Sequence, residues 1–137
     1  MSRKIKAIRC YSEENEVIFL DFMPCKKADY NFIYDFYEES QTEFLRIYQT
    51  DYARLLVPHL RKVYPIVHPI TLEVQTTVDV CFDNVFSKAD WLEVLELLKL
   101  EAASNTVKQE KDFYEAFLLW NIKQLDWAEV MMVEGNQ

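Results

Sequence analysis

The clearest hydrophobic pattern in the chain is the alternation between positions 72 and 82, which read LEVQTTVDVCF. Every second position is apolar apart from Thr76, and the positions between them are polar apart from Cys81. Because alternate side chains of a β-strand point to opposite faces, this pattern predicts one long, half-buried strand with an acidic outer face. A single strand is not stable alone, so the rest of the chain must supply its sheet and cover its apolar face.

Three further segments are predicted as strands. Residues 5–11 form the first, and residues 16–23 form the second, which is apolar on both faces apart from one aspartate. The polar run 12–15 between them predicts a hairpin turn, and Pro24 is expected to end the second strand. The last strand is predicted over residues 127–133.

Apolar residues at helical spacing predict a first helix over residues 27–39, although a strand interpretation of its NFIYDFY portion stays open. Ser40 and Glu43 match a capping box, in which each side chain satisfies a free amide at a helix start. A second helix is therefore expected from Ser40, and Pro58 should kink or end it.

Ser87 is expected to cap a third helix over residues 88–103, and a fourth helix is predicted over residues 107–124. The resulting order is ββααβααβ. It predicts a single α+β domain over residues 1–137, with an about four-stranded, mainly antiparallel sheet and helices packed on one face. The polar face of the 72–82 strand is then left open to water or to a partner.

The charge balance argues about partners. The chain has 137 residues, a formal net charge of −8 and an aromatic content of 15%. An acidic chain repels phosphate on average, so no direct contact with nucleic acid is expected. The basic residues near the N-terminus are interpreted as part of a solvated edge strand. These are Arg3, Lys4, Lys6 and Arg9.

The chain has no apolar run long enough for a transmembrane helix and no pattern of a signal peptide, so no membrane contact is expected. Cys10, Cys25 and Cys81 are widely spaced and form no disulfide framework. Both observations favour a cytoplasmic protein.

Candidate chemistry is sparse. The single glycine, Gly135, leaves no glycine-rich phosphate loop, and the only histidines, His59 and His68, are expected in a surface loop. No metal-binding spacing is present. Acidic pairs such as Asp79 with Asp83 are interpreted as solvated charge. We therefore predict no catalytic residue, no cofactor and no metal.

Clustered tyrosines leave a second possibility open, a small-molecule-binding domain or an enzyme with a tyrosine-lined pocket. The tyrosines concerned are Tyr30, Tyr34, Tyr37, Tyr48, Tyr52 and Tyr64. A third possibility is a homodimeric structural module, in which the sheet face or the last strand pairs with a copy of itself.

The polar face of the 72–82 strand is the predicted partner-binding surface. Its residues are Glu73, Gln75, Thr77, Asp79 and Asp83. Acidic surfaces attract basic partners at high rates, so the hypothesis is an inhibitor of a basic protein such as a nuclease toxin. Small size, acidity and aromatic content are typical of bacterial immunity proteins and phage-encoded inhibitors, although no motif connects this chain to a family.

Overall fold

The computed structural model describes residues 4–32 and 43–137 and shows a small α+β domain. Its main sheet is mixed, with the strand order β1-β3-β2-β7-β6, and β4 pairs with β5 in a second, two-stranded sheet. The strands are β1 Lys4–Ala7, β2 Phe19–Cys25, β3 Glu43–Tyr48, β4 Ile66–Val67, β5 Val74–Gln75, β6 Asp83–Ser87 and β7 Val130–Gly135. Five strands in the main sheet replace the expected four, and β1 pairs with β3 in parallel while the other pairs are antiparallel.

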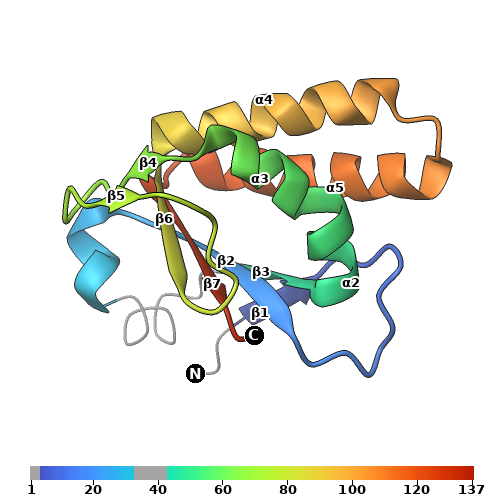
Figure 1. Ribbon diagram of the computed structural model, residues 1–137, viewed down its shortest axis with the longest axis horizontal. Coiled ribbons are helices and arrows are strands. Elements are labelled where there is room, and N and C mark those ends of the chain that lie inside the picture. Colours follow the sequence, from blue (N-terminus) through green and yellow to red (C-terminus); the bar gives the residue numbers. More distant parts are fainter. Residues whose placement is uncertain (1–3, 33–42) are drawn as a thin grey trace.

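Three helices lie together on one side of the main sheet (Figure 1). The first is continuous and consists of α2 Gln49–Asp51, the π-helical turn η2 Tyr52–Leu56 and α3 Val57–Val63. It is followed by α4 Lys88–Ser104 and α5 Lys108–Leu125, and a 3-10 helix, η1 Lys27–Phe32, follows β2. The predictions for α4 and α5 are confirmed within one or two residues, and the Ser87 hydroxyl caps α4 by accepting from the Asp90 amide at 3.1 Å.

The predicted long strand over residues 72–82 is wrong. Leu72 has φ of 65°, a left-handed conformation that a strand does not contain, and only Val74 and Gln75 pair as β5. The chain is then irregular until β6 begins at Asp83. The alternating pattern therefore belongs to a loop, whose backbone groups are satisfied by side chains and by the C-terminus instead of by a neighbouring strand.

Residues 43–48 form strand β3, although a helix was predicted there. Its side chains alternate between the two faces of the sheet. Leu45 and Ile47 join the core under the helices, whereas Phe44 joins a cluster on the opposite face. Ser40 of the expected capping box lies outside the described residues. Since β3 lies between β1 and β2, the expected hairpin at residues 12–15 is also wrong.

Pro24 was expected to end its strand and Pro58 to kink or end its helix, but each lies inside its element. Pro24 belongs to β2, at a point where β2 still pairs with β7 but its pairing with β3 has ended at Phe22. A missing amide is tolerated there because no strand on that side requires it. Pro58 does not end its helix. The π-helical turn η2 precedes it. A wider turn leaves room for the proline ring and does not require the amide hydrogen that proline lacks.

The main sheet is covered on both faces. The helices bury one face, where Phe22, Phe86 and Trp91 pack with ring centroids 5.1 to 5.8 Å apart. The opposite face carries a second buried apolar cluster, against which Tyr30 packs. This cluster consists of Met23, Cys25, Phe44, Val85, Val130 and Met132. The expectation that one sheet face is left open to water is wrong for this part of the sheet.

The last strand is not an edge strand. β7 lies between β2 and β6, so it cannot pair with a second copy along its length. The residues after β7 are fixed by hydrogen bonds. Asn136 bonds through its side chain to the amide of Phe19 and the carbonyl of Val17, and Gln137 accepts a hydrogen bond from Tyr52.

Candidate functional site

The segment between α3 and β6 forms a hairpin at one end of the main sheet and then returns beside β6 (Figure 1). We call residues 66–82 the flap. It begins with the β4–β5 hairpin, in which Ile66 pairs with Gln75 and Val67 with Val74, and continues as an irregular loop over residues 76–82. Between Lys62 and Lys88 the sequence contains no lysine or arginine, so the flap side chains charged at neutral pH, Glu73 and Asp79, are acidic.

Asn84 holds the irregular loop of the flap in place. Its side chain is buried, and its Oδ1 accepts from the Asp79 amide at 2.7 Å and from the Tyr64 hydroxyl at 2.8 Å. Its Nδ2 donates to the carbonyls of Asp79 at 2.6 Å and Val133 at 3.0 Å. One side chain thus joins the loop to β7 and to the end of α3.

Gln75 covers the outer edge of β6. Its Nε2 donates to the carbonyl of Val85 at 2.7 Å, and its Oε1 accepts from the amide of Val85 at 2.9 Å. This pair of bonds is the one that a neighbouring strand would make. An edge strand with free backbone groups invites pairing with other chains, so Gln75 both anchors the flap and protects the edge.

The C-terminus passes beside the flap (Figure 1). The Gly135 amide donates to the carbonyl of Phe82 at 3.2 Å, and the Gln137 amide donates to that of Val80 at 3.3 Å. A Cβ at position 135 would lie 1.8 Å from the Val80 carbonyl oxygen. The only glycine of the chain is therefore placed where the flap backbone approaches β7 most closely.

The hairpin tip of the flap is closed by backbone bonds around His68. The His68 amide donates to the Glu73 carbonyl at 2.8 Å, and the His68 carbonyl accepts from the Leu72 amide at 3.0 Å. Leu72 keeps its left-handed backbone within this tip. Leucine rarely adopts that conformation, which costs roughly 1 kcal/mol, so the surrounding bonds must hold it.

Apolar side chains protrude from this ordered flap. Leu72, Val74 and Phe82 are 73%, 63% and 71% exposed. With Val67, which is 49% exposed, the flap has four exposed large apolar side chains. Single exposed apolar residues are common on protein surfaces, but a group of them within one ordered segment is a candidate binding surface. Backbone order at these positions means that a partner would not have to order the flap on binding.

A polar hollow of about 550 Å³ lies between the flap and β6. Four of the five predicted partner-binding residues line it, namely Gln75, Thr77, Asp79 and Asp83, whereas Glu73 is exposed at the tip. Burial raises the pKa of the Asp83 carboxyl, and Asp79 adds to the rise while His68 opposes it. The structure brings these residues together by folding the loop back over β6, rather than along one strand.

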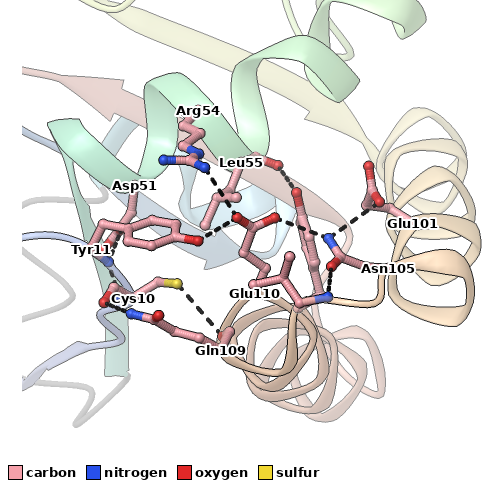
Figure 2. A network of polar contacts seen from close by, with 11 residues as sticks. Cys10, Tyr11, Asp51, Arg54, Leu55, Glu101, Asn105, Gln109 and Glu110 are labelled. Atoms are coloured by element: carbon pink, nitrogen blue, oxygen red, sulfur yellow. Dashed lines mark hydrogen bonds and ion pairs between the residues drawn. The ribbon is translucent and has the colours of Figure 1, made fainter.

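A second polar cluster connects the loop before β2 to the helices (Figure 2). The Tyr11 hydroxyl donates to Oε2 of Glu110, and the Asn105 side chain donates to Oε1 of Glu110 at 3.1 Å. Arg54 lies 3.4 Å from the Glu110 carboxylate and 4.3 Å above the Tyr11 ring. These contacts join three segments that are distant in sequence.

This cluster is poorly suited to catalysis. The hydrogen bond from Tyr11 lowers the pKa of Glu110 and raises that of Tyr11, so Tyr11 keeps its proton and Glu110 stays ionised. Neither residue lines the hollows described in this section. The nearby Cys10 has its pKa raised to about 11 by burial and by Asp51, which leaves it an unreactive thiol at neutral pH. We interpret the cluster as a structural tie.

The remaining sequence expectations have mixed outcomes. His59 and His68 are only 9% and 8% exposed, so placing them on the surface was wrong. The described tyrosines do not gather around one pocket, because Tyr52 is buried and Tyr64 is bound to Asn84. Tyr34 and Tyr37 lie outside the described residues. The three cysteines are free thiols.

A second hollow, of about 420 Å³, lies between α3 and α4. Its apolar lining includes Val63, Leu92 and Leu97, and its charged lining side chains are exposed. Small-molecule sites usually present a few convergent, partly buried polar groups, which this hollow lacks in the described part of the chain.

Within residues 4–32 and 43–137, no group of three or more histidine, cysteine or acidic side chains is placed to hold a metal ion. The helices of the same ranges include none long and apolar enough to cross a membrane.

A comparison with known proteins finds no family model, no curated protein and no solved structure that matches the chain.

Proposed function

We propose that this protein is a non-catalytic binding module that recognises a basic protein partner through its flap. The observation that carries the proposal is the combination of a fixed flap backbone, protruding apolar side chains and an adjoining acidic hollow. Protein interfaces combine apolar or aromatic anchors with a polar surround, and both parts are present here within residues 72–83.

Charge defines the partner. The flap carries Glu73 and Asp79, and Asp83 of β6 adjoins it. No lysine or arginine lies between Lys62 and Lys88, and the whole chain has a net charge of −8. A partner with a lysine or arginine beside an apolar residue would place the cation in the hollow and the apolar group against Phe82. An inhibitory, immunity-type role fits this chemistry, because a nuclease must carry a basic site to hold phosphate.

A selection from a displayed random-peptide library on the immobilised full chain tests the proposal. We expect enrichment of basic peptides that contain apolar residues. A synthesised enriched peptide should bind at least about tenfold more weakly to Phe82→Ser, as is usual for an interface anchor. Replacing Asp83 by Asn should weaken binding too, and added salt should reduce the affinity for the unmodified chain.

Leu119→Ser is the matched control, because Leu119 on α5 is 61% exposed and lies outside the flap. It should leave the peptide affinity unchanged. Peptides that bind equally to the unmodified chain and to Phe82→Ser, or a selection without basic peptides, would contradict the proposal.

A further inference from the structure

We infer that His68 is a proton-sensitive positioning residue: its neutral imidazole holds the tip of the flap in its binding shape, and protonation of Nδ1 releases that tip. The inference rests on the proposed function, because it concerns the regulation of the same surface. It is carried by the hydrogen bonds that the two ring nitrogens make.

The ring of His68 accepts hydrogen bonds that a backbone carbonyl would accept in an ordinary turn. Its Nδ1 lies 3.1 Å from the amide of Ile70 and 3.1 Å from the amide of Thr71, and it accepts from both. Its Nε2 lies 3.0 Å from the hydroxyl of Tyr30 on η1. The side chain thus joins the tip of the flap to η1 as well as closing the turn.

These bonds determine the tautomer. A nitrogen that accepts two amide hydrogens must carry a lone pair, so the single proton of neutral His68 resides on Nε2 and points at the Tyr30 oxygen. An imidazolium donates from both nitrogens. Its Nδ1–H would then face two N–H donors, so the charged ring and the observed turn are incompatible.

The surroundings keep the ring neutral at pH 7. Burial lowers the pKa of His68, and the two carboxylates that face it, Glu73 of the tip and Asp83 of β6, only partly offset this. Tyr30 also faces the ring and stays uncharged, because burial raises its pKa. The proton is therefore taken up only on the acid side of the ordinary histidine pKa, about 6.5.

Release of the turn changes the binding surface. The tip holds Leu72 in its left-handed conformation, and the amides of the two preceding residues are fixed only while Nδ1 accepts from them. Once the turn opens, Leu72 can return to a common conformation. A partner then has to order the tip during binding, which weakens its affinity.

Amide hydrogen exchange of the full chain, followed by NMR, tests this without a partner. Between about pH 7.5 and about pH 5, the protection factors of the Ile70 and Thr71 amides should fall about tenfold or more. The Val85 amide, which is bound to Gln75, should stay protected and serves as an internal reference.

His68→Asn is the informative variant. Its side-chain oxygen can accept from the amides two and three residues on, as asparagine does in turns, but it does not titrate. We expect protection at neutral pH that persists in acid. His59→Asn is the matched control, because His59 is equally buried on α3, and it should leave the acid response of the tip intact. Unchanged protection in the unmodified chain, or the same loss in His68→Asn, would overturn the inference.

A binding measurement separates this inference from the proposed function. The affinity for the selected basic peptide should fall about tenfold between about pH 7.5 and about pH 5, and much less in His68→Asn. Asp83→Asn measures the part that its own carboxyl contributes. Peptide binding that ignores pH refutes the role of His68 and leaves the proposed function standing. A selection without binders refutes the function, and amide exchange then decides the role of His68 alone.

Discussion

Single polar side chains replace secondary structure along the flap. Asn84 and Gln75 make the hydrogen bonds that strands would otherwise make, and His68 does the same for a turn. Each of these residues is ordinary in the sequence, where asparagine and glutamine predict only a turn or a solvated position. Their partners are brought to them by the fold, so the order of the flap depends on a few contacts of large individual effect.

Gly135→Ala should be among the most destabilising conservative changes in the chain. The added Cβ would lie 1.8 Å and 2.5 Å from the carbonyl oxygen and carbon of Val80, which are backbone atoms that cannot rotate away. We expect a loss of about 2–3 kcal/mol in the free energy of unfolding, measured with urea. Gln137→Ala, which removes the partner of the Tyr52 hydroxyl, should cost about 1 kcal/mol. A loss below about 0.5 kcal/mol for Gly135→Ala would show that the flap is not packed against β7 as described.

Individual elements are held together by connections that are not regular structure. The loop between β1 and β2 has few backbone partners, and α2 supplies them through Asp51. Its carboxylate is fully buried and accepts from the amides of Cys10 at 2.9 Å, Tyr11 at 2.7 Å and Ser12 at 3.4 Å. Figure 2 shows this anchor beside the contacts of Tyr11 with the helices. The loop and the first helix therefore behave as one unit.

Asp51→Asn tests this anchor. The substitution removes the negative charge and replaces one accepting oxygen by an NH₂ group, which would face the backbone N–H groups of the loop. We therefore expect a loss of about 2–3 kcal/mol in the free energy of unfolding. Protease cleavage within residues 8–18 should also become faster. Tyr11→Phe is the control on the same loop, since it removes only the hydroxyl bound to Glu110, and it should cost about 1 kcal/mol. Equal stabilities of the two variants would contradict the anchoring role.

At the scale of the whole molecule, the buried histidines make folding sensitive to acid. Burial lowers the pKa of both His59 and His68. Between the lowered folded values and the unfolded value of about 6.5, the unfolded chain binds more protons than the folded one. Stability conferred by the neutral rings is therefore fully present above about pH 6.5 and falls as the pH decreases through that window.

The midpoint of urea unfolding, measured between about pH 7.5 and about pH 5, should reveal this dependence. The double variant His59→Asn/His68→Asn should have a flatter profile than the unmodified chain over the same range. Each single variant should remove part of the pH dependence of the midpoint, which would assign that dependence to the two histidine rings. A slope that persists unchanged in the double variant would assign the acid sensitivity to carboxyl groups instead.

The sequence by itself determined the α+β class and the pair α4–α5. Their long apolar periodicity agrees with a hydroxyl cap at Ser87, so local and tertiary preferences coincide. The acidity of the flap, and four of the residues that line its hollow, were also readable from sequence.

Only the tertiary structure decided which segments became strands. Residues 43–48 pair with a strand on each side and form β3. Residues 76–82 are hydrogen-bonded to the Asn84 side chain and to the C-terminus and stay irregular. The physical reason is that a strand makes its hydrogen bonds with segments distant in sequence. A pattern of period two therefore predicts which side chains can face a core, but it does not predict whether a neighbouring strand is available to pair.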